Sequence, residues 1–342
     1  MSESPSPEYS VIIPSYNRAD EIDELLDSLD RLDEDSPDFE CLIVDDGSTD
    51  NTDEVADRHK SSVDFSIRLI RQENQGPGAA RNNGMAHANG EVFIFLDSDT
   101  IIDPGWLNAI DREVRDGADA FGGPDEAAED FTPLQKAINY TMTSLLTTGG
   151  IRGKEKRVGK YYPRSFNMGL RRGIYEKIGG FGALRHGQDI EFSQRILDTG
   201  ADVRFIPDAV VYHKRRTSLR KFFKQVFNWG VARINLYKIN NQMLEKVHTF
   251  PAIATVLGMF LLVLAVLGSK PAVWVLLAGI GLVILQGVHA GVASRSIAVG
   301  GLVVLTAPIQ IVGYGLGFLW GIFRGIVRGE ETVEGFVKNY YK

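Results

Sequence analysis

Two aspartates separated by one residue, Asp97 and Asp99, follow an apolar run of residues. Carboxylates with this spacing after a buried strand can share one hard divalent ion, such as Mg²⁺ or Mn²⁺, which keeps further positions for substrate phosphates. An adjacent pair, Asp45 and Asp46, ends another apolar run. Such a pair is costly to bury without a partner, and its oxygens can accept hydrogen bonds from ribose hydroxyls or a base N–H. The two pairs are therefore candidates for metal and ligand binding.

Two more polar clusters have the same placement. Residues 15–18 read Ser-Tyr-Asn-Arg, and residues 74–82 form a glycine-rich stretch that includes Arg81. A glycine-rich turn that enters a helix lets backbone N–H groups approach a phosphate. A helix start also needs such residues, so both interpretations of this turn remain open.

The elements that must position these clusters alternate between strand and helix. Apolar runs predict four strands, and apolar residues at helical spacing predict the helices between them. The strands are expected at Tyr9–Pro14, Phe39–Val44, Ser66–Ile70 and Val92–Leu96, and the helices at Ala19–Leu32, Thr52–His59 and Gly78–Ala88. This order indicates an α/β fold, a mainly parallel sheet sandwiched by helices. Ligands of such sheets bind outside the carboxyl ends of the strands, where all four clusters fall.

Charge is distributed unevenly along the 342 residues. Residues 1–150 carry a net charge of −23, residues 151–246 carry +13, and residues 247–342 carry +3. Hydrophobic residues make up 44%, which excludes a wholly disordered chain. The single cysteine, Cys41, excludes an intramolecular disulfide framework and a cysteine-based zinc site.

Three uncharged stretches, Ala252–Gly268, Pro271–Ala293 and Ile297–Phe323, dominate the last third of the chain. About 20 apolar residues span a bilayer, so we expect an α-helical membrane region of two to three transmembrane helices. Buried core helices are the alternative, and the short connections between the stretches disfavour it. The basic segment before Phe250 predicts a cytoplasmic amino-terminal domain. The basic residues after Phe323 oppose this orientation if all three stretches cross.

The motifs SVIIPSYNR, VDDGSTD, NQGPGAARNNG and FLDSDT, in this order, resemble those of family 2 glycosyltransferases with the GT-A fold. The later run Gly179-Gly180-Phe181 followed by Gly187-Gln188-Asp189-Ile190-Glu191-Phe192 supports the resemblance, which covers roughly residues 9–245. The family uses nucleotide-activated sugars and inverts the anomeric centre. The motifs do not specify the sugar.

The resemblance implies a role for each matching residue. Metal binding falls to Asp99, with Mg²⁺ or Mn²⁺ as the ion, and the role of general base falls to Asp189. The nucleotide-sugar donor would be bound by Pro14, Tyr16, Asn17, Asp45 or Asp46, Arg81 and Asp97. His213 is either a further contact to the diphosphate or metal, or a structural histidine.

Many relatives have Glu-Asp where this chain has Gln188-Asp189. Glutamine cannot act as a base, so the role falls on Asp189, with Glu191 as the alternative. A helix cap is the structural interpretation of Asp189. An acceptor hydroxyl needs a base and an ionised lipid phosphate does not, so this carboxylate favours a glycan hydroxyl over a polyprenyl or dolichyl phosphate.

A basic region lies between these motifs and the apolar stretches. Residues 149–164 contain four glycines and six Lys or Arg, and they are either a flap over the diphosphate or a solvated loop. Residues 217–238 interleave basic and aromatic side chains, which is typical of an amphipathic helix on membrane lipids. The adjoining apolar stretches disfavour nucleic acid as a partner. Gln225 and Trp229 match the Gln-x-x-Arg-Trp signature of processive polysaccharide synthases, but Asn228 replaces its arginine.

We therefore expect an inverting, metal-dependent glycosyltransferase in the cell membrane, acting on a lipid-linked glycan. The alternatives are a polyprenyl- or dolichyl-phosphate sugar synthase, a processive polysaccharide synthase, and a degenerate sugar-nucleotide sensor. The expected parts are a cytoplasmic catalytic domain (1–215), interface helices (216–246), transmembrane helices (247–326) and a tail (327–342). The first ten residues lack the features of a signal peptide, in agreement with a cytoplasmic catalytic domain in a multi-pass protein.

Overall fold

The computed structural model describes residues 8–126, 131–144, 147, 161–213 and 217–336. The chain divides into two compact units. The first contains the described residues up to 126 and residues 161–213, and the second contains the described residues 131–147 and 217–336. The segment 149–164, expected to be a flap or a solvated loop, lies outside the described residues except for 161–164.

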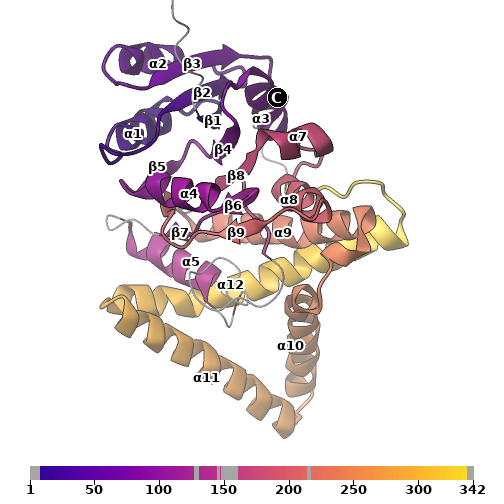
Figure 1. Cartoon of the computed structure of the whole chain (residues 1–342). Helices are drawn as coiled ribbons and strands as arrows, with labels where there is room; N and C mark the ends of the chain where they lie inside the picture. The colour runs from indigo at the N-terminus through magenta and orange to yellow at the C-terminus, as the bar shows by residue number, and fades with distance from the viewer. Residues whose placement is uncertain (1–7, 127–130, 145–146, 148–160, 214–216, 337–342) are drawn as a thin grey trace, which may run out of the picture. The chain divides into compact units, whose positions relative to one another are not determined.

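A seven-stranded sheet forms the centre of the first unit, in the order β3-β2-β1-β4-β8-β6-β9 (Figure 1). The strands are β1 (Tyr9–Ser15), β2 (Phe39–Asp45), β3 (Ser66–Arg71), β4 (Val92–Leu96), β6 (Ala120–Gly122), β8 (Asn167–Arg171) and β9 (Val203–Phe205). The first four pair in parallel, so their carboxyl ends meet at one edge. The strand β8 is antiparallel to both of its neighbours. The expected mainly parallel sheet is confirmed.

Helices cover both faces of this sheet because side chains alternate along each strand. Val11 and Ile13 of β1 pack in one buried cluster with α1, α2 and α4, whereas Ile12 packs in a second cluster with α3, α7 and α8. The helices are α1 (Ala19–Leu29), α2 (Thr52–Lys60), α3 (Pro77–His87), α4 (Trp106–Arg115), α7 (Arg172–Ile178) and α8 (Gln188–Asp198). Two apolar layers therefore fix the edge at which the polar clusters lie.

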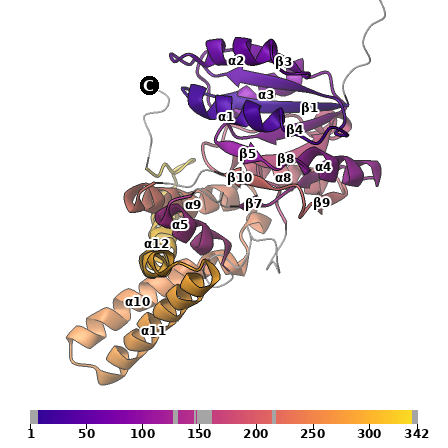
Figure 2. The same cartoon turned by 90° about the vertical axis from the view of Figure 1, so that its left-hand side faces the viewer.

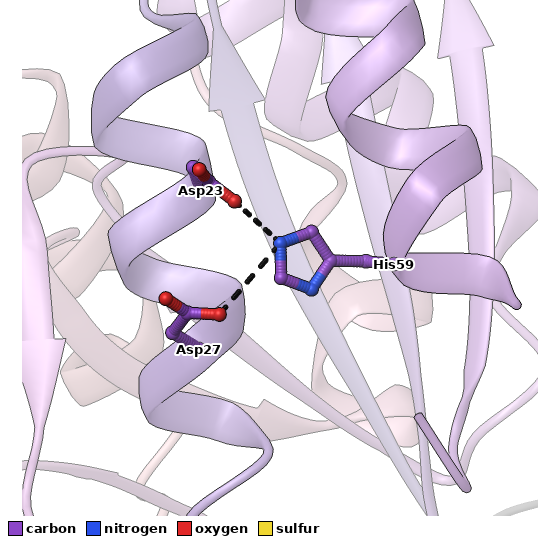
Figure 3. Close-up of side chains that lie close together, drawn as sticks. All are labelled: Asp23, Asp27 and His59. Atoms are coloured by element: carbon purple, nitrogen blue, oxygen red, sulfur yellow. Dashed lines mark hydrogen bonds and ion pairs between the residues drawn. The ribbon is translucent and has the colours of Figure 1, made fainter. Parts of the chain in front are cut away.

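The expected strands and helices agree with the structure to within a few residues. The helix α1 ends at Leu29 rather than at Leu32, because residues 30–32 continue in turns closed by backbone hydrogen bonds to Leu26, Ser28 and Leu29. Asp23 and Asp27 of α1 approach His59 of α2 (Figure 3), with carboxylate oxygens 2.6 and 3.8 Å from Nε2. Arg58 also pairs with Asp23. We interpret this group as an ion-pair link between two neighbouring helices.

A second, three-stranded sheet was not expected from the sequence. It contains β5 (Thr100–Ile102), β10 (Val211–His213) and β7 (Asp125–Glu126), with β10 in the middle. The register pairs Thr100 with His213 and Asp125 with Val211. This small sheet brings together three segments that are far apart in the sequence.

The second unit is helical in its described part. Its helices are α5 (Pro133–Thr143), α9 (Leu219–Ile239), α10 (Phe250–Val266), α11 (Lys270–Ala293) and α12 (Ile297–Gly321), followed by a π-helical turn (Ile322–Val327). Figure 2 shows α10 and α11 joined by a short turn. Three segments, Lys246–Val266, Lys270–Ala293 and Ile297–Val327, are long and apolar enough to span a membrane. They are the three stretches found in the sequence, and they anchor the chain in a membrane.

Glycines permit close helix contacts in this unit. A Cβ atom at Gly317 of α12 would lie 2.0 Å from the Phe227 carbonyl oxygen of α9, and one at Gly230 would lie 2.2 Å from the Tyr314 carbonyl oxygen. Small residues that let helix backbones approach are typical of packing in membranes. Asn228 of α9 donates to the Phe336 carbonyl and accepts its backbone N–H. The residue that replaces the arginine of the processive signature therefore binds the carboxy-terminal segment.

Candidate active site

Three potential metal ligands converge in the first unit. Ligand atoms of Asp97, Asp99 and His213 lie within 4.8 Å of one another, and His213 Nε2 is 3.0 Å from an Asp99 carboxylate oxygen. The two aspartates follow β4, and the pairing of Thr100 with His213 brings the histidine beside them. The sequence singled out all three residues, and the small sheet explains how His213 joins the aspartates.

The donor set suits a divalent ion. Two carboxylates supply hard oxygen ligands, which Mg²⁺ and Mn²⁺ prefer, and an imidazole is a better ligand for Mn²⁺ than for Mg²⁺. The 3.0 Å between His213 and Asp99 is a hydrogen-bond distance, and it is also compatible with neighbouring ligands of an octahedral ion, which are roughly 3 Å apart when the bonds are about 2.1 Å. The acidic and histidine side chains present therefore fit a metal.

Asp125 was not expected at this site from the sequence. Its side chain is buried, and one carboxylate oxygen lies 3.8 Å from His213 Nδ1, on the side of the ring opposite the nitrogen that faces Asp99. At 3.8 Å this contact is electrostatic and not a hydrogen bond, and a carboxylate behind a metal-binding histidine favours one orientation of the ring. No local motif marks Asp125, because it reaches the site only through the pairing of β7 with β10.

Asp97, the first of the three potential metal ligands, also forms an ion pair with Arg81. Arg81 is 5% exposed, comes from α3, and its guanidinium carbon lies 5.5 Å from the centre of the Phe181 ring. Its Nε atom is buried without a hydrogen-bond partner among the described residues. A buried guanidinium with a remaining donor can bind a phosphate or base oxygen.

Asp45 and Asp46 are both buried, but their partners differ. One oxygen of Asp45 accepts the Ser48 N–H at 2.8 Å, and the other lies 3.4 Å from Arg71 Nε. Asp46 accepts hydrogen bonds from the Gln72 side chain and from the backbone N–H groups of Gln75 and Gly76, all at 2.7 to 2.8 Å. Asp46 thus organises the glycine-rich turn before α3, a role that the sequence did not indicate.

The first two strand-end clusters contact each other. Asn17 has a positive φ of 51°, its N–H donates to Ser48 Oγ, and its side-chain oxygen accepts the Thr49 N–H, both at 2.8 Å. Pro14 is buried in β1, and Tyr16 is half-buried beside it. The structure therefore places the expected donor-binding residues of β1 and β2 together.

Asp189 is the second residue of α8 and is not its N-cap, which is Gly187. One carboxylate oxygen accepts a hydrogen bond from the backbone N–H of the next residue, Ile190, at 3.0 Å. The other carboxylate oxygen lies 3.2 Å from Arg164 Nη1. Glu191, the alternative base, accepts hydrogen bonds from two guanidinium nitrogens of Arg195, Nε and Nη2, at 2.6 and 2.9 Å. Asp189 is therefore the less constrained of the two carboxylates.

Gln188 is the departure from the Glu-Asp pattern, and it contacts the glycine-rich turn. A Cβ atom at Gly78 would lie 2.6 Å from the Gln188 amide nitrogen, so the side chain fills the space that this glycine leaves. The amide also donates to the Gly182 carbonyl at 3.1 Å. Gln225 and Trp229 belong to α9 in the second unit, where Trp229 packs with Phe222 and Val226.

Residues 10–179 match the sequence model of glycosyl transferase family 2. The chain contains a family 2 glycosyltransferase domain. This match, the similar proteins and the GT-A-type fold all indicate the same activity, so the chain is a glycosyltransferase.

Two relatives and one solved structure illustrate the similarity. The glycosyltransferase AglE of Haloferax volcanii is 28% identical over 245 residues, which cover 70% of this chain and 78% of AglE. The poly(ribitol-phosphate) beta-N-acetylglucosaminyltransferase TarS of Staphylococcus aureus is 33% identical over 150 residues, 40% of this chain and only 26% of TarS. The mannosyltransferase PcManGT of Pyrobaculum calidifontis, solved with GDP-Man and Mn²⁺, aligns with a TM-score of 0.63 and 20% identity, covering 93% of this chain and 88% of PcManGT. This last likeness establishes the fold.

Proposed function

We propose that this chain transfers a sugar from a UDP- or GDP-linked donor to a hydroxyl of a lipid-linked glycan, with inversion at the anomeric carbon. The observation that carries the proposal is the group of Asp97, Asp99 and His213 in one compact unit with a carboxylate, Asp189, at the start of α8, a helix that packs on β4 through Phe192 and Phe95. The family match supports the reaction type, and the membrane helices support a lipid-linked acceptor.

The donor would be held at the carboxyl ends of β1, β2 and β4. Asp45, Asn17, Tyr16 and Pro14 are proposed to contact the nucleoside, since carboxylate and amide oxygens accept hydrogen bonds from ribose and base. Asp46 would contribute by holding the glycine-rich turn. Arg81 would bind the base or the phosphates, and Asp97 would fix Arg81.

Asp99 and His213 would hold a divalent ion, with Asp97 as a further ligand and Asp125 behind the histidine. When bound, this ion stabilises the negative charge that develops on the leaving diphosphate. Mn²⁺ fits the imidazole better than Mg²⁺ does, and the structurally similar PcManGT was solved with Mn²⁺.

Asp189 is the proposed general base. It would accept the proton of the acceptor hydroxyl while that oxygen bonds to the anomeric carbon, and the bond from this carbon to the diphosphate oxygen breaks with its electron pair on the leaving group. One displacement from the opposite face inverts the anomeric centre. A base of this kind contributes roughly 10²- to 10⁴-fold to the rate.

The membrane arrangement is part of the proposal. Residues 1–215 would contain the catalytic domain in the cytoplasm, although α5 of this range belongs to the second unit. Residues 216–246 would lie at the membrane surface, 247–326 would cross a cell membrane more than once, and 327–342 would form a tail. Basic residues before Phe250 support the cytoplasmic side. Gln225 and Trp229 of α9 are assigned to the interface segment, and nucleic acid is not proposed as a partner.

The test is sugar transfer by membranes that contain the protein. Labelled nucleotide sugars are supplied with a lipid extract, and the label that enters the lipid phase is measured. The labelled product is then digested to identify the bond that was formed. Label linked to a glycan hydroxyl with inverted configuration supports the proposal. Label linked directly to a lipid phosphate would replace it with a polyprenyl-phosphate sugar synthase, and long polymers would replace it with a processive synthase.

A further inference from the structure

Arg164 forms an ion pair with Asp189, the proposed general base. Its Nη1 atom lies 3.2 Å from a carboxylate oxygen of Asp189, and the two side chains are 17% and 22% exposed. Among the residues that the structure describes, Asp189 is the side chain with which Arg164 pairs. The attraction between two charges that are mostly removed from water is stronger than at the surface, because solvent screens it less.

The backbone around Arg164 is fixed on both sides. Its carbonyl accepts the Asn167 N–H at 2.9 Å, which closes a short turn before β8. Asn167 is 1% exposed, accepts the Trp106 indole N–H at 3.0 Å, and donates to the Ala209 carbonyl at 2.8 Å. The turn that carries Arg164 is therefore anchored in the centre of the first unit.

The preceding residues are bound to the same helix that carries Asp189. The Pro163 carbonyl accepts a hydrogen bond from Ser193 Oγ at 2.7 Å, and the Tyr162 hydroxyl donates to Gln194 Oε1 at 3.0 Å. Ser193 lies one helical turn after Asp189, so the segment 162–164 runs along one side of α8. Three successive contacts thus hold the guanidinium beside the carboxylate.

Asp189 depends on Arg164 for its orientation, because its other hydrogen bond does little to fix the side-chain rotamer. That contact is the N–H of the adjacent residue Ile190, at 3.0 Å. An aspartate at the start of a helix can adopt other rotamers, and a base displaced by about 1 Å can lose 10²-fold in rate. A guanidinium fixed by its own backbone restricts the carboxylate to one orientation and stabilises its negative charge.

We propose that Arg164 is a positioning residue for the proposed base Asp189, and that transfer to a hydroxyl acceptor depends on their ion pair. The inference rests on the proposed function, because it assumes that Asp189 accepts the acceptor proton. Arg164 acts through Asp189, so its removal lowers kcat for sugar transfer while the affinity for the nucleotide-sugar donor is kept.

The experiment is a double-mutant cycle in the full-length, membrane-embedded protein. Arg164→Ala, Asp189→Asn and the double variant are compared with the wild type for kcat, for the KM of the acceptor, and for donor binding by titration calorimetry. Arg112→Ala is the matched control, because Arg112 forms an ion pair of the same length, 3.2 Å, with exposed Asp208. Donor binding also reports whether each variant is folded.

Arg164→Ala is expected to lower kcat roughly 10- to 100-fold, the effect of losing one charge-assisted hydrogen bond. Arg164→Lys and added guanidinium ions should restore part of this loss, and the double variant should be no slower than Asp189→Asn. Additive losses in the double variant would overturn the proposal, as would a raised acceptor KM with unchanged kcat.

Failure of the proposed function gives a different pattern. If the wild type transfers sugar to a lipid phosphate, or if Asp189→Asn keeps the wild-type kcat, the base assignment itself is wrong and the positioning role falls with it. If Asp189→Asn loses activity but Arg164→Ala matches the Arg112→Ala control, the base stands and only the inference about Arg164 is refuted.

Discussion

Replacing Asp46 with asparagine should loosen the glycine-rich turn before α3. The carboxylate accepts two backbone N–H groups, from Gln75 and Gly76, and one side-chain N–H from Gln72. The asparagine amide has one acceptor oxygen, so its NH₂ group would face one of these donors. Losing one charge-assisted hydrogen bond and leaving a buried donor unpaired costs about 3 kcal/mol together.

Hydrogen exchange measured by mass spectrometry tests this value. About 3 kcal/mol corresponds to roughly 100-fold faster exchange of the Gln75 and Gly76 amides, if the turn opens locally. Asp45→Asn is the control, because Asp45 bonds to Ser48 instead. Unchanged exchange at Gln75 and Gly76 in Asp46→Asn would refute the assignment of Asp46 as the organiser of the turn.

Three further predictions concern the metal group, the membrane helices and the sheet. Asp125→Asn should weaken activation by Mn²⁺ about 10-fold, measured as the Mn²⁺ concentration for half-maximal transfer; an unchanged value contradicts the orienting role. Gly317→Val should lower thermal stability in detergent through a clash between α12 and α9, whereas Gly301→Val, with no atom within 4 Å of its added Cβ, should not. Burial raises the pKa of Glu40, but hydrogen bonds from Asn89, Ser10 and Arg68 outweigh it and hold that pKa below its usual range. Glu40 therefore stabilises the fold above the unfolded-state pKa of about 4.3 and loses this contribution as pH falls through the folded-state pKa. Thermal melts should show that Glu40→Gln loses less stability between pH 7 and pH 3 than the wild type does. Equal losses in the two proteins would contradict this role of Glu40.

The first four strands could be predicted from the sequence almost to the residue. The strands β1, β2 and β4 are mainly apolar runs that end in polar residues, as strands buried on both faces are, whereas β3 lies at the sheet edge and is only partly buried. Asp97 and Asp99 were readable for the same reason, since they directly follow the buried β4. Local sequence is sufficient where the strand itself delivers the functional side chain.

Asp125 and Arg164 reach the site through long-range contacts and could not be predicted from local sequence, whereas His213, which also arrives by long-range pairing, was named only through the resemblance to the family. Asp125 belongs to a two-residue strand, too short for any periodic signal, and it meets His213 only because β10 lies beside β7. Arg164 and Asp189 are 25 positions apart with a turn and two elements between them. Asp46 was identified as a ligand candidate, but its hydrogen bonds to the turn depend on the return of the chain after β3.

The most direct test of the proposed reaction is sugar transfer by membranes carrying the wild type, Asp99→Ala or Asp189→Asn, with Mn²⁺ or with EDTA. We expect the wild type to transfer sugar to a glycan hydroxyl with Mn²⁺. We expect loss of that transfer with EDTA and in Asp99→Ala, and a loss of about 10²-fold or more in Asp189→Asn. Transfer that survives both EDTA and Asp99→Ala would contradict the metal site, and transfer that survives Asp189→Asn at the wild-type rate would contradict the base.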